Sequence, residues 1–223
     1  MHVPPRVRGG LVGRSVALLV GLFLFAVGIV CQLESRLGLS PWDVLHQGIA
    51  EHTPFSFGAA NVVVGLIVLV IAWSLGATIG LATIANSVLV GTFVQALTAI
   101  DAVDGLAEDP LGVRIALLAI AMPVYGIASA LYLGAWMGAG PRDSLMVVVG
   151  ARTHLRLGLV RAGIELLALA AGFALGGTVG IGTIVFALSI GPALEGGFWL
   201  LRRSPVGAPA PGATPVPAPL VGS

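Results

Sequence analysis

Six long apolar runs, separated by short polar passages, make up most of the chain. They cover residues 15–33, 57–75, 79–97, 115–133, 157–175 and 179–199. A helix needs about 20 apolar residues to cross roughly 30 Å of hydrocarbon, and each run is close to that length. A segment surrounded by lipid must satisfy its own backbone hydrogen bonds, and the runs lack the polar and apolar alternation of barrel strands. The pattern therefore predicts an all-α fold, a polytopic membrane helix bundle with six spans.

A polar passage after the first run recurs after the fourth. Residues 38–58 read GLSPWDVLHQGIAEHTPFSFG, and residues 138–158 read GAGPRDSLMVVVGARTHLRLG. The two halves superpose without a gap, and the identities include Gly38/Gly138, Pro41/Pro141, Asp43/Asp143, Gly58/Gly158, Thr83/Thr183 and Gly91/Gly191. Shared Pro, Asp, Thr and Gly at one constant offset indicate an internal duplication. Each half holds three spans, an odd number, so the sequence predicts two inverted three-helix repeats, as in many secondary transporters.

Each repeat is expected to contain a short helix after its first span. Ser40 is placed to cap a helix that starts at Pro41, with Asp43 three residues after the serine, as in a capping box. In the second copy Gly140 takes the position of the cap. The two helices either lie on opposite membrane surfaces or dip into the bilayer, with their N-termini facing an anion or Asp43 and Asp143 facing a cation. The alternative is that both carboxylates only cap free amides at the helix starts.

The distribution of arginine orients the predicted spans. Arginines precede the first run and follow the fourth and the sixth, whereas residues 101–112 are acidic and contain none. By the positive-inside rule the acidic loop lies outside and both termini are cytoplasmic, with Arg36 alone on the wrong side. The expected organisation is a cytoplasmic N-terminal segment at 1–13, a first membrane repeat at 14–100, an acidic external loop at 101–113, a second membrane repeat at 114–200, and a disordered Pro/Ala/Gly-rich cytoplasmic tail at 201–223.

Composition narrows the class of function. With 57% hydrophobic and 9% charged residues and a mean hydropathy of +1.03, the chain belongs in a bilayer. A net charge of +1 and the absence of lysine argue against binding nucleic acid, which needs clustered basic residues. The single cysteine, Cys31, has no partner for a disulfide or a zinc site within one chain. No hydrolase, phosphate-loop or metalloprotease motif is present, so we expect no catalytic residues, no metal site and no cofactor.

Four polar side chains inside the apolar runs are candidate ligands for a substrate or ion. Glu165 falls well inside the fifth run, where a charge costs about 2.5–3.5 kcal/mol even on insertion scales, and Arg161 lies four residues earlier on the same helical face. An ion pair within the helix and a substrate counter-ion are both open readings. Asn61 and Asn86 lie within the second and third runs, where they either donate hydrogen bonds to a ligand or join helices.

The polar passages hold further residues to which the sequence assigns more ordinary roles. Trp42 is expected in the aromatic belt at the membrane interface rather than against a ligand. The polar side chains expected at the interface, with proton handling as the alternative for the group, are those of His46, Glu51, His52 and His154.

One stretch of the first half resembles a known family. The segment LSPWDVLHQGIAEHTPFSFGAANVVVGLIVLV, followed by GLATIANSVLVGTFVQAL, is similar to the YczE/YyaS/YitT family of bacterial integral membrane proteins. The features that carry the resemblance are Gly38, Pro41, Trp42, Asp43, Gly58, Thr83, Ile84 and Asn86, and it extends over most of residues 14–200. In the second half Arg142 replaces the tryptophan and Phe186 the asparagine. The resemblance implies a multipass protein of the bacterial plasma membrane.

Two classes of function fit these observations. The first is a small-solute transporter, with the lipid bilayer and a small solute or ion as its partners. The second is a membrane scaffold or accessory protein for a partner complex, and a homodimer also stays open. A polar cavity lined by Glu165, Asn61 and Asn86 would favour transport. A dry interface in which Arg161 alone satisfies Glu165 would favour the scaffold.

Overall fold

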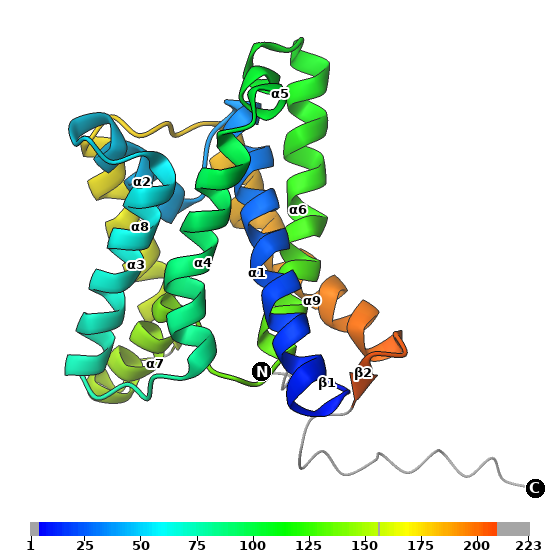
Figure 1. Ribbon diagram of the computed structural model, residues 1–223. Coiled ribbons are helices and arrows are strands. Elements are labelled where there is room, and N and C mark those ends of the chain that lie inside the picture. The colour runs from blue at the N-terminus through cyan, green and yellow to red at the C-terminus, as the bar shows by residue number, and fades with distance from the viewer. Residues whose placement is uncertain (1–4, 156, 209–223) are drawn as a thin grey trace, which may run out of the picture.

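The computed structural model describes residues 5–155 and 157–208, which form a bundle of helices (Figure 1). The elements in chain order are β1 (Arg6–Val7), α1 (Gly10–Ser35), α2 (Pro41–His52), α3 (Phe57–Ser74), α4 (Leu81–Thr98), α5 (Asp101–Asp104), the 3-10 helix η1 (Gly105–Glu108), α6 (Leu111–Gly134), α7 (Pro141–Thr153), α8 (Leu157–Ala174), α9 (Ile181–Arg203) and β2 (Gly207–Ala208). A helix occupies each of the six predicted runs, which confirms the all-α class.

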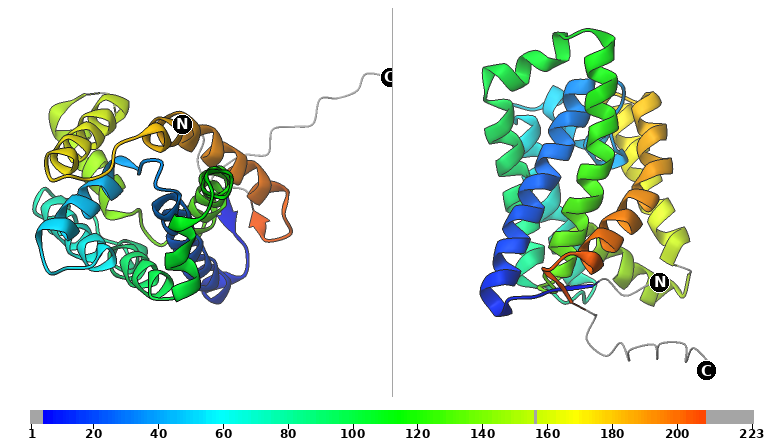
Figure 2. Two further views of the ribbon diagram at one scale, coloured as in Figure 1. Left: turned by 90° about the horizontal axis from the view of Figure 1, so that it is seen from above. Right: turned by 90° about the vertical axis from the view of Figure 1, so that its right-hand side faces the viewer.

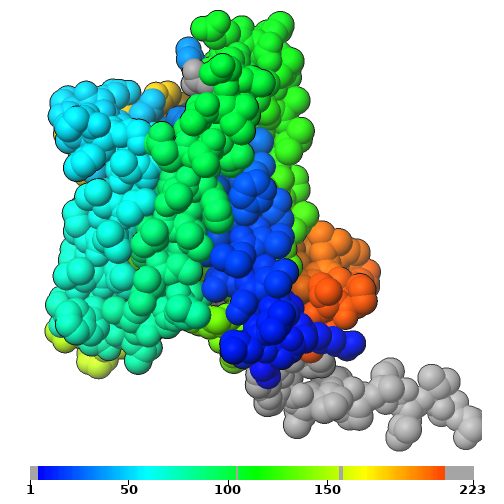
Figure 3. Space-filling model, in the orientation of Figure 1, coloured from blue at the N-terminus to red at the C-terminus, as the bar shows by residue number. Residues whose placement is uncertain are grey.

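Five of the described helices are long and apolar enough to cross a membrane. They are α1, α3, α4, α6 and α9. Large apolar side chains such as Phe23, Val70 and Ile84 are exposed on α1, α3 and α4. In Figure 3 these three helices form one continuous face of the molecule. An exposed apolar surface of this extent suits contact with lipid, so the fold is a helical membrane bundle.

The two short helices begin where the sequence predicts them. Proline is the first residue of both α2 and α7, where its missing N–H costs no hydrogen bond. The Ser40 hydroxyl accepts a hydrogen bond from the backbone N–H of Asp43 at 3.3 Å. Gly140 precedes α7 and offers no capping side chain. Both predicted starts are confirmed, and Figure 1 places α2 and α7 at opposite ends of the bundle.

The helices of the two halves are intertwined. Helices α1 and α6 make the most extensive contact in the bundle. Their core includes the buried side chains of Leu22, Ile29 and Tyr125, together with Val94 from α4. The short helix α2 packs on α8 of the second half, and α7 packs on α3 of the first. Seen from above, α2 and α8 lie together on one side of the bundle and α6 and α9 on the other (Figure 2). Each short helix is therefore held by the opposite half of the chain.

Several contacts between the halves occur twice, displaced by the same offset. Arg14 donates to the backbone oxygens of Ala135 and Trp136, and Arg114 donates to those of Ser35 and Arg36. The backbone N–H of residue 82 donates to the oxygen of residue 137, and that of residue 182 donates to the oxygen of residue 37. These bonds satisfy carbonyls at the C-terminal ends of α1 and α6, where the helix itself supplies no donor.

Two glycines in these contacts need their lack of a side chain. Gly38 and Gly138 have φ angles of +117° and +125°, a conformation that glycine adopts without strain. A Cβ added to Gly38 would lie 2.6 Å from the backbone nitrogen of Gly180, and one added to Gly138 would lie 2.8 Å from the Cα of Gly80. These close approaches link the segment before each short helix to the other half of the chain.

The two helix pairs α3/α4 and α8/α9 differ sharply in packing. The first pair is tightly packed, and a Cβ added to Gly58 would lie 2.5 Å from the backbone oxygen of Gly91. The corresponding glycines of the second pair, Gly158 and Gly191, have no atom within 4 Å of such a Cβ. The helices α8 and α9 are not among the closely packed pairs of the described structure. The bundle is therefore closed between α3 and α4 and open between α8 and α9.

The connecting segments show more structure than the sequence pattern indicates. The predicted external loop contains the short helices α5 and η1. The last helix continues to Arg203, and Gly207–Ala208 pairs antiparallel with Arg6–Val7, so ordered structure extends past residue 200. The two strands lie at the same end of the bundle as α7 (Figure 1). The predicted disordered tail otherwise lies outside the described residues.

Candidate binding pocket

A cavity of about 260 Å³ lies where the two halves meet. The first residues of both short helices line it, together with side chains from α1, α3, α4, α6, α8 and α9. Its polar side chains come from Ser40, Asn61, Asn86, Ser129, Tyr132, Arg142, Asp143, Arg161 and Glu165. A small cavity with converging polar groups, set among apolar residues, is typical of a small-molecule site.

Arg142, the second residue of α7, connects the two short helices. Its guanidinium carbon lies 4.7 Å from the centre of the Trp42 ring, which is cation–π distance, and its NH2 nitrogen lies 3.5 Å from Nε2 of His46. Both contacts are with residues of α2. Within residues 5–155 and 157–208, no carboxylate lies at ion-pair distance from this guanidinium. The N-terminal turns of α2 and α7 therefore meet through one cation at the cavity.

A buried polar network supports that cation from behind. The Asp43 carboxylate accepts a hydrogen bond from the Ser40 hydroxyl, and its other oxygen lies 3.2 Å from Nδ1 of His46. The side-chain amide of Asn61, on α3, lies 3.1 Å from the same ring nitrogen. Asp43 and His46 are buried, and the edge of His46 packs against the ring of Phe57. Every polar atom of this network has a partner, as burial requires.

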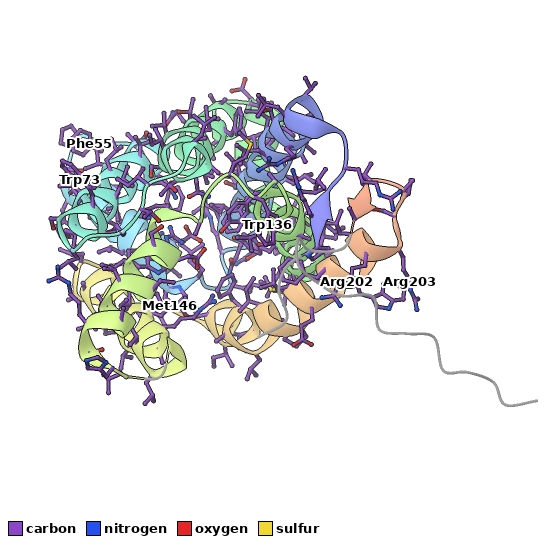
Figure 4. All side chains as sticks on the ribbon, turned by 90° about the horizontal axis from the view of Figure 1, so that it is seen from below. Phe55, Trp73, Trp136, Met146, Arg202 and Arg203 are labelled. Atoms are coloured by element: carbon purple, nitrogen blue, oxygen red, sulfur yellow. The ribbon has the colours of Figure 1, made fainter. Side chains whose placement is uncertain are left out.

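The start of α7 carries a second group of polar residues. The Tyr132 hydroxyl donates to the Asp143 carboxylate at 2.9 Å. Asn86 reaches toward the same turn from α4, since a Cβ added to Gly140 would lie 3.6 Å from its Oδ1 atom. Figure 4 views this end of the bundle and labels Met146, which lines the cavity from the next turn of α7. The cavity thus has an amide, a carboxylate and a phenol near the guanidinium of Arg142.

The charged pair on α8 lies on another wall of the cavity. The Nε atom of Arg161 donates to the Glu165 carboxylate at 2.9 Å, with side chains 48% and 32% exposed. The pair within the helix, one of the two readings of the sequence, is therefore present. Both residues also line the cavity, so the pair faces open space instead of a sealed interface.

The structure brings the predicted site residues together. Asn61, Asn86, Asp143, Arg161 and Glu165 line one cavity, and Asp43 lies directly behind it. Ser40 caps α2 by accepting from the Asp43 backbone N–H, whereas the Asp43 carboxylate contacts the Ser40 hydroxyl and His46 rather than a free amide.

Two expectations were wrong, and one residue was missed. Trp42 and His46 were expected at the membrane interface, yet Trp42 is 8% exposed and His46 is fully buried. Both are buried because α2 packs on α8 instead of lying on the surface. Arg142 was considered as one of the arginines that orient the spans and as a departure from the family motif, but not as a site residue. The sequence feature that could have identified Arg142 as a site residue is its position directly after the proline that starts a helix, in a chain with very few charges.

In the described part of the chain, no cluster of three or more His, Cys, Asp or Glu side chains has the arrangement of a metal site. The pocket instead offers a guanidinium outside any ion pair of the described residues, several uncharged hydrogen-bonding groups and four aromatic rings, those of Phe25, Trp42, Tyr132 and Phe186. These groups are suited to reversible binding of a small polar molecule.

Comparison with known proteins places this architecture in a family. Residues 12–196 match the family of unknown function DUF6198. The chain belongs to this family. An uncharacterized protein of Haemophilus influenzae is 36% identical to this DUF6198 member over 188 residues, covering 84% of each chain. The uncharacterized membrane protein YczE of Bacillus subtilis is 32% identical over 193 residues, covering 83% of this chain and 85% of the relative.

The second of these relatives confirms the resemblance to the YczE family and supports the membrane location. No solved structure matches this DUF6198 chain.

Proposed function

We propose that the protein is a carrier for a small polar solute, with six spans arranged as two inverted repeats and both termini in the cytoplasm. In this proposal α8 crosses the membrane, and α2 and α7 are re-entrant helices whose N-termini meet near the bilayer midplane. Secondary transporters place their sites at such a junction of broken helices. The protein itself performs no catalysis.

The cavity of about 260 Å³ between the halves is the observation that carries this proposal. It combines Glu165, Asn61 and Asn86, the residues whose convergence distinguishes a transport pocket from a dry scaffold interface. Buried polar side chains are costly in a membrane protein and usually line a pathway or a site. The doubled contacts of Arg14 and Arg114 support a symmetric origin of the two halves.

The unequal packing of α3/α4 and α8/α9 supports a carrier that alternates between two states. The close contact of Gly58 and Gly91 lies next to α2 in the chain, and the open positions Gly158 and Gly191 lie next to α7. In an inverted repeat the two junctions exchange roles, so the second closes when the first opens. The structure then corresponds to the state with its pocket open toward the α7 end.

The orientation proposed follows from arginine. Arg202 and Arg203 are the last residues of α9. Figure 4 labels them in a view of the end of the bundle that also holds α7. Positive charges concentrate on the cytoplasmic side of membrane proteins, so we assign this end to the cytoplasm.

Accessibility of a single cysteine in the pocket tests the carrier proposal. Ser129 on α6 lines the cavity, and a Ser129→Cys change in a Cys31→Ser background preserves its size. An impermeant thiol reagent should modify this cysteine from either side of the membrane. The matched control is Leu166→Cys, at an exposed apolar position next to Glu165, which faces lipid and should remain unmodified.

Reaction at Ser129→Cys from neither side would contradict the carrier proposal and favour the scaffold. Reaction from one side only would contradict alternation between two states. The reagent should also react with a cysteine in place of Ser204, at the end of α9, from the cytoplasmic side alone, which checks the assigned orientation.

A further inference from the structure

We propose that Arg142 binds the anionic group of the transported solute, and that protonation of His46 promotes this binding. The solute is then a small oxyanion, such as a carboxylate or sulfonate, and a proton is the coupling ion. The inference rests on the proposed carrier function and adds the substrate class and the energy source to it.

The cation at the cavity is poised for an anion. Arg142 is held by the face of Trp42 and by a contact of 3.5 Å to His46, and within the described residues no acidic side chain pairs with it. A guanidinium is always charged and presents a planar fork of donors that matches a carboxylate. Asp43 and Asp143 act on this charge from beyond ion-pair distance. A bound solute would supply an opposite charge in direct contact with the guanidinium.

The start of α7 adds a second attraction for an anion. This helix has 13 residues, its cap, Gly140, supplies no side chain to its first amides, and the acidic residue of its first turn, Asp143, is bonded to Tyr132. Unpaired N–H groups and the helix dipole together favour an anion at such a position. Arg142 belongs to the same turn, so the fork of the guanidinium and the helix start face the same cavity.

The carboxylates near Arg142 attract it electrostatically but form no ion pair with it. Asp43 is bound by Ser40 and His46, Asp143 by Tyr132, and Glu165 by Arg161. Because each has a nearer partner, Arg142 keeps donors for a molecule in the cavity. The uncharged groups of Asn86 and Ser129 line the same space and are available to the rest of the solute.

The partners of His46 determine its neutral tautomer. Nδ1 lies 3.2 Å from an oxygen of Asp43, which accepts, and Nε2 lies 3.5 Å from a nitrogen of Arg142, which only donates. Neutral His46 therefore carries its hydrogen on Nδ1 and accepts from Arg142 through Nε2. The Asn61 amide nitrogen lies 3.1 Å from the same Nδ1. Because two donors cannot bond to each other, this tautomer requires the amide to be turned so that its oxygen faces the ring.

A proton on Nε2 changes this contact from attractive to repulsive. The ring can then no longer accept from Arg142, and two positive charges face each other across the short distance. An anion bound in the cavity against the guanidinium relieves that repulsion, while Asp43 stabilises the imidazolium from the other side. Proton binding at His46 and anion binding at Arg142 therefore favour each other, and linkage makes the effect reciprocal.

Asp43 and Arg142 are the charged groups that contact His46, and the other described helices around it add no further charge at contact distance. Helix α3 presents Asn61 and Phe57 and contains no titratable residue. Helix α8 contributes Arg161 and Glu165 to the cavity, and they pair with each other. On α2 the charged neighbour is Asp43, and on α7 it is Arg142.

Binding to the purified full-length protein tests the inference. The probes are acetate, methanesulfonate and benzenesulfonate, the two sulfonates remaining ionised throughout the range in which histidine titrates. The fluorescence of Trp42, on which the guanidinium lies, should change with saturation as an anion binds, and Trp42→Phe should remove the signal. Affinity at the acidic end of the histidine range should exceed that at the alkaline end by about fivefold or more.

Matched variants separate the roles of the two residues. Arg142→Gln should weaken binding by about tenfold or more, whereas Arg152→Gln, in the last turn of the same helix, should not. Should Arg142→Gln fold poorly, Arg142→Lys retains the charge without the fork and should bind more weakly than the unaltered protein. His46→Gln should abolish the pH dependence, and His52→Gln, at the exposed end of α2, should retain it.

Proton uptake can be measured when methanesulfonate is added to the protein in weak buffer. A purely structural role of His46 would not produce such uptake. The unaltered protein should take up protons, and His46→Gln should not. Binding that is independent of pH, or equal in Arg142→Gln, would overturn the inference. If the inference fails but Ser129→Cys still reacts from both sides, the carrier function stands without the anion and proton sites. If that cysteine reacts from neither side, the carrier function itself has failed.

Discussion

If the protein is the proposed carrier, a single added methyl group at Gly158 should hold it in one state. The prediction comes from its counterpart Gly58, where a Cβ would lie 2.5 Å from the oxygen of Gly91 and 2.7 Å from the Cβ of Gln95. At Gly158 the same Cβ meets nothing within 4 Å, so alanine is accommodated in the described conformation. In the exchanged state Gly158 would take up the tight contact, and overpacking of this kind costs about 1–3 kcal/mol.

That cost corresponds to a shift of about 5- to 150-fold in the balance of the two states. The assay is the rate at which an impermeant thiol reagent modifies Ser129→Cys in vesicles of each orientation. Gly158→Ala should preserve the reaction from the α7 side and slow that from the α2 side by this factor. Gly58→Ala should do the opposite, because it prevents closure between α3 and α4.

The control is Gly112→Ala in the first turn of α6, which also has no atom within 4 Å of an added Cβ and takes no part in either junction. It should leave both rates unchanged. If Gly158→Ala slows both rates equally, or lowers thermal stability as much as Gly58→Ala, the two junctions do not exchange roles and the reasoning fails.

Two further predictions concern stability, measured as thermal unfolding of the protein in detergent. Gly38→Ala should be strongly destabilising, since it combines positive-φ strain of about 1–3 kcal/mol with a clash at Gly180, and Gly112→Ala should not; equal melting temperatures would refute the close approach. Glu165→Gln should cost at most about 1 kcal/mol, because its pair with Arg161 is partly exposed in the cavity; a much larger loss would show a dry, sealed pair.

Local sequence patterns predicted most of the helical elements but not where the short helices lie. The starts of α2 and α7 follow from proline and its neighbours, because capping and the loss of a backbone N–H are decided within a few residues. Whether a helix of 12 or 13 residues lies on a surface or inside a bundle depends on its packing partner. That partner is α8 for α2 and α3 for α7, and both are distant in sequence.

The candidate site was predicted in the same uneven way. Glu165 and Asn61 stand out because polar side chains are rare in apolar runs. Arg142, Trp42 and His46 belong to polar passages, where such residues are ordinary, so nothing local distinguishes them. Their importance arises only when the starts of α2 and α7 meet, which brings Arg142 onto the ring of Trp42 and next to His46.

The intertwining of the halves bears on how the protein is made. Helix α2 emerges from the ribosome early, but its packing partner α8 begins at Leu157. At about 5–20 residues per second, α2 waits on the order of ten seconds for it. Throughout that interval His46 and Asp43 lack the surroundings that bury them. Packing of the first half is therefore completed only once the second half of the chain has been made.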